Sequence, residues 1–164
     1  MKVNILPLLR GEKDRIPFSL RTDIASVTPD VVSGTAETAG AVYSEAGRIV
    51  LEADIVMDIN AVCGRCGEET NHKPETRISR TVTDGSSEDD PDCIAADGNG
   101  DVDIDEAVFD AVLLSMPMRF LCREDCRGLC PVCGVNLNDS SCSCVAETPD
   151  PRLAKLREYL ENNK

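Results

Sequence analysis

Apolar and polar residues alternate along several short runs in the first half of the chain. The period of two is clearest at four successive alternate positions, Ile49, Leu51, Ala53 and Ile55. Such alternation places the apolar side chains on one face of a β-strand. Residues 45–47 separate two of these runs, and Gly47 can adopt the positive φ of a tight hairpin turn. We therefore predict antiparallel strands over this half, with a further strand near residues 76–83.

The apolar spacing becomes helical after residue 104. The residues at this spacing are Val108, Val112, Leu113 and Met116. Asp105 is the predicted N-cap, Ile104 and Phe109 are placed to form a hydrophobic staple, and Pro117 ends the run. Asp150 and Pro151 begin a second predicted helix, and its apolar face consists of Leu153, Leu156 and Leu160. We expect this last helix to dock on the rest of the protein.

These elements predict the α+β class, within one integrated domain of residues 1–164. An antiparallel sheet, open or barrel-like, is followed by a helix, a cysteine-rich segment and a C-terminal helix. Residues 1–83 form the β-rich region, which contains the first cysteine pair. Residues 84–104 are an acidic flexible loop, and residues 105–164 hold the helices and the other cysteine pairs.

The negative charge is concentrated in one segment. The chain has 30 acidic and 17 basic residues, for a net charge of −13. Residues 84–110 contain 11 of the acids and no Lys or Arg, so the other 137 residues sum to only −2. Nucleic acid is held through a basic surface, so the overall charge excludes a protein that coats it non-specifically.

The N-terminus does not resemble a secretory signal. Pro7 interrupts its apolar stretch and Arg10 closes it. No run approaches the roughly 18 apolar residues of a membrane span. We therefore predict a cytoplasmic protein with no membrane partner, in which thiols stay reduced and clustered cysteines more often bind metal than form disulfides.

Eight of the nine cysteines occur as close pairs. The pairs are Cys63 and Cys66, Cys122 and Cys126, Cys130 and Cys133, and Cys142 and Cys144. Two of them are C-x2-C motifs followed by glycine, which lets the backbone turn so that its amides point at sulfur. Four pairs supply the ligands of two tetrahedral four-thiolate sites, for which zinc is the expected metal and iron the alternative.

Two assignments of these pairs to sites remain open on spacing. The last two pairs can close a short loop at little entropic cost, which leaves the first two pairs to form the other site. The rival assignment joins the two C-x2-C motifs, as in a zinc ribbon. Loop closure favours the first assignment.

Other candidate residues have structural interpretations. Cys93 lies among acids that disfavour a reactive thiolate, so we interpret it as an incidental loop thiol. We expect His72, the single histidine, at the surface. Residues 97–108 place oxygen ligands at alternate positions, as a calcium-binding loop does. Val102 and Val108 stand where such a loop has glycine and glutamate, so we interpret this stretch as a polar linker that ends in a helix cap.

Catalysis has little support in the sequence. One histidine without a partnered nucleophile argues against a hydrolytic triad. A catalytic zinc needs an open coordination position, whereas four thiolates close the shell. We therefore predict a protein that is not an enzyme and has no small-molecule substrate; the alternative is a rubredoxin-like iron or thiol-redox protein.

Four arginines lie close to cysteines in the sequence. They are Arg65, Arg119, Arg123 and Arg127. A metal-ordered surface that carries them can contact RNA phosphates locally despite the global charge. They can equally neutralise four-thiolate zinc centres, each of which has a formal charge of −2. Both interpretations stay open.

The cysteine-rich segment resembles the C-terminal half of bacterial YceD-like proteins, also described as large ribosomal RNA subunit accumulation proteins. The matching motifs are Cys122–Asn138, Cys142–Cys144 and Asp150–Leu153, preceded by Cys63–Cys66 and Leu114–Pro117. The resemblance is to the form with the additional C-terminal cysteine cluster.

The resemblance implies a bacterial factor in ribosome assembly that supports accumulation of the large-subunit (23S) RNA. Its partners would be that RNA, or ribosomal proteins of an assembling particle, and no catalytic residues are implied. Shorter relatives keep positions equivalent to the first four cysteines and lack the last four. That difference implies one metal site formed by the first four cysteines and another formed by the last four.

Overall fold

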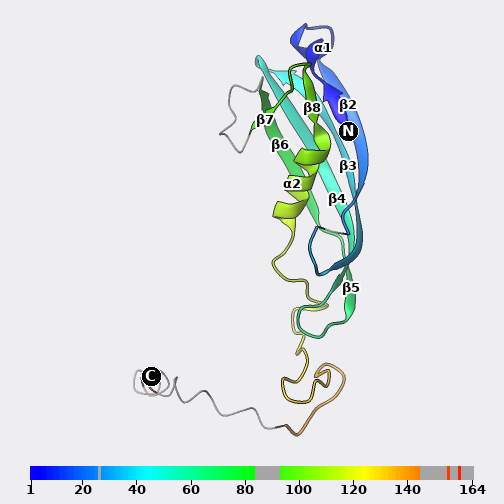
Figure 1. Ribbon diagram of the computed structural model, residues 1–164, viewed down its shortest axis with the longest axis vertical. Helices are drawn as coiled ribbons and strands as arrows, with labels where there is room; N and C mark the ends of the chain where they lie inside the picture. Colours follow the sequence, from blue (N-terminus) through cyan, green and yellow to red (C-terminus); the bar gives the residue numbers. More distant parts are fainter. Residues whose placement is uncertain (26, 84–92, 145–154, 156–158, 160–164) are drawn as a thin grey trace.

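A twisted sheet of long strands forms most of the molecule (Figure 1). The computed structural model describes residues 1–25, 27–83, 93–144, 155 and 159. The strand order is β2-β3-β4-β6-β7, with β5 also beside β4, and every pairing is antiparallel except that of β6 with β7. The strands are β2 (Arg15–Asp23), β3 (Val31–Glu45), β4 (Arg48–Val62), β5 (Glu69–His72), β6 (Glu75–Thr83) and β7 (Cys93–Ala95).

The central strand β4 shows why this sequence forms a sheet. Its odd-numbered residues from Ile49 to Ala61 are all buried, whereas its even-numbered residues are half-buried or exposed. The predicted alternation is therefore confirmed and continues to the end of the strand. β3 and β4 join through a hairpin in which Ala46 and Gly47 both have positive φ, as a type I′ turn requires.

One helix and a small second sheet cover the buried face. Helix α2 (Ile104–Ser115) buries Ile104, Val108 and Val112 in the same core as β4. Strand β1 (Lys2–Asn4) pairs with β8 (Asp101–Asp103), and the short helix α1 (Leu6–Leu9) adds Leu8 to the core. Within the described residues, no helix is long and apolar enough to cross a membrane.

The beginning of α2 differs in detail from the prediction. Asp103, rather than Asp105, is the N-cap, and its carboxylate accepts a hydrogen bond from the Asp105 amide at 3.0 Å. Ile104 is the first helical residue and is fully buried, whereas Phe109 is 44% exposed. The start of the helix is therefore held by the burial of Ile104 in the core rather than by the predicted contact between Ile104 and Phe109. The helix ends at Ser115, two residues before Pro117, as expected.

Part of the acidic segment has regular structure instead of being a flexible loop. Residues 93–95 form β7 on the edge of β6, and residues 101–103 form β8 against the N-terminal strand. Asp97 holds the turn between them, because its Oδ1 accepts hydrogen bonds from the amides of Asn99 and Asp101 at 2.9 and 3.0 Å. These amide hydrogen bonds lower the pKa of Asp97. Pairing with distant strands therefore overrides the polar composition here.

The α+β expectation is confirmed in its coarse form, as a mostly antiparallel sheet with few helices. Among the described residues, no pairing joins the outer strands β2 and β7, so the sheet is not a closed barrel. Residues 84–92 of the acidic loop and most of the predicted C-terminal helix lie outside the described residues. The proposed division into three regions stays a prediction.

Gly40 is a sensitive position in the sheet. It pairs with Ala53, and a Cβ at residue 40 would meet the Glu52 carbonyl oxygen and the Ala53 Cβ well inside van der Waals distance, and the Ala53 Cα at 2.6 Å. We expect Gly40→Ala to destabilise the protein by about 1–3 kcal/mol, because backbone must move to admit the methyl group. Urea unfolding followed by circular dichroism measures this loss.

Gly98→Ala is the matched control, because nothing lies within 4 Å of a Cβ at that position. An equal effect of the two substitutions on the unfolding midpoint would contradict the close packing of β3 on β4.

Candidate metal centres

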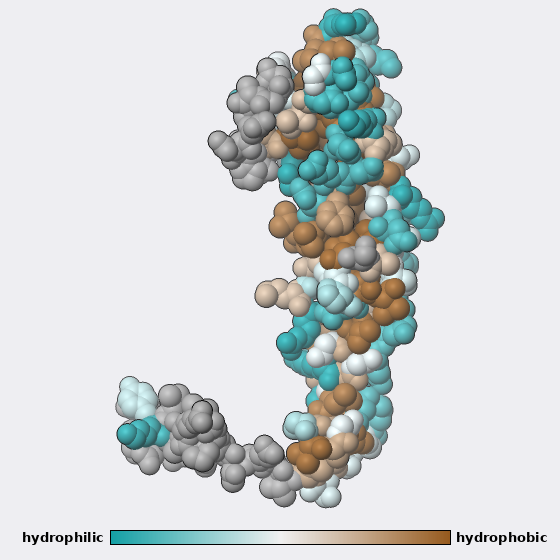
Figure 2. Space-filling view, viewed as in Figure 1, coloured by the Kyte–Doolittle hydropathy of each residue, from teal (hydrophilic) through white to brown (hydrophobic). Residues whose placement is uncertain are grey.

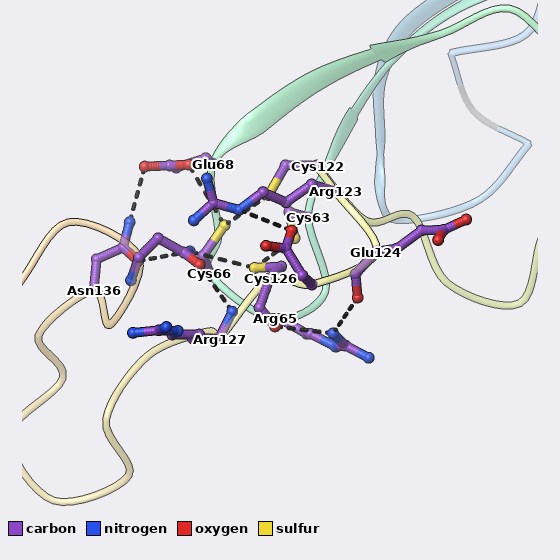
Figure 3. A network of polar contacts seen from close by, with 12 residues as sticks. Cys63, Arg65, Cys66, Glu68, Cys122, Arg123, Glu124, Cys126, Arg127 and Asn136 are labelled. Atoms are coloured by element: carbon purple, nitrogen blue, oxygen red, sulfur yellow. Dashed lines mark hydrogen bonds and ion pairs between the residues drawn. The ribbon is translucent and has the colours of Figure 1, made fainter.

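The first group of four thiols joins two distant parts of the chain at one end of the sheet (Figure 3). We call this group centre 1; its members are Cys63, Cys66, Cys122 and Cys126. Cys63 and Cys66 lie in the turn between β4 and β5, and the other two lie in the segment that follows α2. Three of the four side chains are buried, and Cys122 is half-buried.

The sulfur positions of centre 1 fit a tetrahedral ion. All four Sγ atoms lie within 4.8 Å of one another. The Cys63 and Cys126 sulfurs are 3.9 Å apart, and the Cys66 and Cys122 sulfurs are 3.6 Å apart. Zinc–sulfur bonds of about 2.3 Å in a tetrahedron place neighbouring sulfurs about 3.8 Å apart. No disulfide joins any of these cysteines.

The glycine after the C-x2-C motif has the expected role. Gly67 has a φ of +77°, and its amide donates to the Cys63 carbonyl at 2.9 Å. The Cys63 amide in turn donates to the Glu68 carbonyl at 2.8 Å. This tight turn brings Cys63 and Cys66 to the same point. Gly134 repeats the conformation after Cys133, with a φ of +73°.

The environment of centre 1 shifts the pKa values of its thiols in opposite directions. Burial raises the pKa of Cys63, but backbone hydrogen bonds, the strongest at Cys122, outweigh burial and lower that pKa to about 6. A backbone hydrogen bond at Glu68 lowers the pKa of Cys66, but burial and the neighbouring sulfurs outweigh it and raise that pKa to about 12. A divalent cation would remove the repulsion between thiolates, so metal binding releases protons here.

The second group of four thiols, centre 2, lies farther along the same segment and is more exposed. Its members are Cys130, Cys133, Cys142 and Cys144, and their sulfurs also lie within 4.8 Å of one another. Cys130 is buried, whereas Cys133 and Cys144 are exposed. The structure thus groups the pairs as loop closure favoured, and the rival grouping of the two C-x2-C motifs is not observed.

Two asparagines connect the loop of centre 2 to centre 1. The Asn138 side-chain amide donates to the Cys126 sulfur at 3.3 Å, and its Oδ1 accepts from the Arg127 amide at 2.8 Å. The Asn136 amide donates to the Glu68 carboxylate at 2.9 Å. Sequence reasoning missed these residues, because no spacing rule relates an asparagine to a cysteine on another loop.

The four arginines proposed for RNA contact all lie around centre 1 and are all exposed. The Arg65 guanidinium donates to the backbone carbonyls of Glu124 and Cys126 at 3.0 and 2.9 Å, so it supports the fold of the site. Arg123 forms an exposed ion pair with Asp125 at 3.4 Å. The side chains of Arg119 and Arg127 have no ion pair among the described residues.

The remaining candidates stay outside both groups. His72 is half-buried rather than at the surface, with its ring centroid 5.2 Å from that of Phe120. Cys93 is a residue of β7 rather than of a loop. Within the described part of the chain, no third cluster of metal-ligating side chains occurs, and Asp97 and Asp101 accept hydrogen bonds from the protein itself.

A β-rich first half followed by a cysteine-rich segment, with two groups of four cysteines, can be compared with known families. The family model of the large ribosomal RNA subunit accumulation protein YceD matches residues 51–159, which include most of β4, all of α2 and all eight grouped cysteines. The chain belongs to the YceD family. The match confirms the resemblance seen in the cysteine motifs.

Relatives of this family member occur in bacteria and in plants. It is 35% identical over 104 residues to an uncharacterized protein of Mycobacterium tuberculosis, an alignment that covers 60% of this chain and 49% of the relative. A chloroplastic YCED homolog 1 of Arabidopsis thaliana, named a large ribosomal RNA subunit accumulation protein, is 26% identical over 71% of this chain and 47% of its own length. The chain thus spans about half the length of these relatives. No solved structure matches it.

Removing a ligand of centre 2 tests the separation of the centres. We expect Cys130→Ser or Cys133→Ser to release one equivalent of bound metal and loosen the C-terminal segment while the sheet remains folded. Elemental analysis measures the metal, and far-ultraviolet circular dichroism follows the sheet. Global unfolding, or loss of all metal, would contradict two separate centres.

Asn138→Ala tests the contact between the centre 2 loop and Cys126. Loss of a hydrogen bond to a ligand sulfur typically weakens metal affinity roughly 10- to 100-fold. We therefore expect a chromophoric chelator to remove metal from one centre of the variant at a roughly 10- to 100-fold lower chelator concentration than it needs with the wild-type protein. Asn71→Ala is the control, since the only hydrogen bond of the Asn71 side chain among the described residues is to the surface carboxylate of Asp58. Equal metal loss from both variants would refute the role of Asn138.

Proposed function

We propose that this YceD-family protein is a non-enzymatic, zinc-stabilised factor that binds an assembling large ribosomal subunit in the cytoplasm. The observation that carries the proposal is the convergence of eight cysteines into two four-sulfur groups in a chain of this family. Closed four-thiolate sites stabilise folds, whereas catalysis requires an open coordination position. The family's name supplies the link to large-subunit RNA.

The grouping of the cysteines favours zinc over iron. A rubredoxin-type centre uses two C-x2-C-G motifs around a single ion, but here each motif belongs to a different group. Centre 1 adds a C-x3-C pair to its motif, and centre 2 adds a C-x-C pair. Thiol-redox chemistry is also disfavoured, because Cys63 and Cys66 lie between two strands rather than at the start of a helix that would activate a thiolate.

The surface around centre 1 is the proposed RNA contact. Arg119, Arg123 and Arg127 are exposed there, and Arg65 lies beside them. Their guanidinium groups can bind phosphate oxygens in bidentate geometry. The acidic segment makes the overall charge unfavourable for non-specific RNA binding, so contact would depend on this local surface.

A triple substitution tests this surface in cells. We expect Arg119→Gln, Arg123→Gln and Arg127→Gln together to reduce comigration of the tagged protein with large-subunit precursors in sucrose gradients. We also expect lower 23S RNA in a deletion strain complemented with this variant, because three phosphate contacts are removed. Arg10→Gln, Arg21→Gln and Arg48→Gln make the same charge change on exposed arginines away from centre 1 and should leave both readouts unchanged.

Two results would overturn the proposal. One is a wild-type protein that never comigrates with large-subunit precursors. The other is a deletion strain with normal 23S RNA levels.

A further inference from the structure

A groove runs between strand β6 and helix α2, away from both cysteine groups. Two hollows lie along it, of about 220 and 250 Å³, and Arg80 contributes to the lining of both. In the first hollow the sheet side consists of Arg80 and the three residues of β7, and α2 contributes Glu106, Ala107 and Asp110. In the second hollow the sheet side consists of residues 76–80 of β6, and α2 contributes Ala111, Leu114 and Ser115. In Figure 1, α2 lies beside β6 along this length.

The sheet edge that forms one wall of the groove is open. Residues 75–82 of β6 pair with β4 on one side. On the other side, only Thr81–Thr83 are paired, with β7. Within the part of the chain that the structure describes, residues 75–80 therefore have no partner strand on this side. The backbone N–H and C=O groups that point to this side are free to pair with another strand. β7 itself shows that this edge accepts a short parallel strand.

The helix wall presents apolar side chains to solvent. Leu114, which lines the second hollow, is 79% exposed, and Met118 just beyond the helix is fully exposed. Phe109 and Leu113 on the same helix are each nearly half exposed but line neither hollow. Figure 2 shows hydrophobic side chains at the surface in the middle of the elongated molecule, where Figure 1 places α2. Unpartnered apolar residues beside an open strand edge are typical of peptide-binding grooves.

The charge of the groove selects the kind of partner. Asp103, Glu106 and Asp110 line the first hollow, with Arg80 as its single base, and α2 contains no Lys or Arg. Arg77 and Arg80 line the second hollow, where Arg77 is already paired with Glu52 at 2.7 Å and Asp54 at 3.7 Å. Over both hollows, three carboxylates therefore face one arginine, Arg80, that has no ion pair among the described residues. This surplus of carboxylates attracts a basic chain and repels phosphate groups.

We propose that the groove between β6 and α2 binds an extended basic segment of a partner protein, which adds as a strand to Glu75–Arg80 beyond the end of β7. Main-chain hydrogen bonds to β6 provide affinity, and alternate side chains of the segment meet Leu114 and the carboxylates of α2. Six residues of β6 span about 20 Å, so the bound segment has about six residues in contact. This inference concerns a surface separate from the arginines around centre 1 and does not require that they bind RNA.

Fluorescence anisotropy on the purified, metal-loaded full chain tests the proposal. The probe is a labelled synthetic peptide of about eight residues in which lysine and valine alternate. We expect it to bind, and we expect a glutamate–valine peptide and a lysine–valine peptide with alternate backbone amides N-methylated to bind at least tenfold more weakly. On binding, hydrogen exchange should slow at the amides of residues 75–80.

Two charge-reversed variants locate the site. Glu106→Lys with Asp110→Lys should weaken peptide binding about tenfold, since two attractions become repulsions. Glu12→Lys with Glu37→Lys makes the same charge change at exposed positions elsewhere and should leave affinity unchanged. The proposal is overturned if the peptide does not bind, if the N-methylated peptide binds equally, or if the two double variants behave alike. It is also overturned if single-stranded RNA, rather than the peptide, slows exchange at residues 75–80.

Discussion

The convergence of four sulfur atoms at centre 1 is the constraint on which the cysteine-rich half depends. The pairs Cys63–Cys66 and Cys122–Cys126 are separated by 55 residues, and their four sulfurs still lie within 4.8 Å of one another. Thiolates this close repel one another, and burial adds a desolvation cost. A divalent cation bound there would cancel the repulsion, offset the desolvation cost and turn an unfavourable cluster into a cross-link between the sheet and the segment after α2.

The rest of that segment is built outward from centre 1. Two side chains connect the loop of centre 2 to centre 1. The Asn138 side chain donates a hydrogen bond to the Cys126 sulfur, and the Asn136 side chain donates one to the Glu68 carboxylate. Centre 2 then closes a short local loop with two exposed thiols. The sheet, by contrast, has its own core along β4, so the sheet would stay folded under conditions that strip metal from either centre.

The net charge of −13 is unevenly distributed, and three of the described surfaces differ in local charge. Exposed arginines surround centre 1, whereas carboxylates line the first hollow of the groove between β6 and α2. The outer face of the sheet carries exposed ion pairs such as Arg21 with Glu37. Such exposed pairs contribute little to stability individually. Among the described residues, the arginine surface and the groove between β6 and α2 are the places where we expect charge to select a partner.

Local periodicity and cysteine spacing could be read from the sequence, but contacts between distant segments could not. The alternation around Ile55 identified β4, because one face of that strand is buried throughout. Spacing and loop closure favoured the observed cysteine groups. The strands β7 and β8 were missed because three-residue strands in an acidic segment have no local signature and exist only through pairing with β6 and β1. Asp103 and Asp105 are both competent N-caps, so the choice between them depended on the burial of Ile104.

Native mass spectrometry combined with elemental analysis of the purified full chain tests the central claim most directly. Two zinc ions per chain, in a colourless protein without disulfides, is the result that the two four-thiolate centres predict. Bound iron with a visible thiolate-to-metal absorption band, or a metal-free protein with the same eight cysteines oxidised, would contradict them.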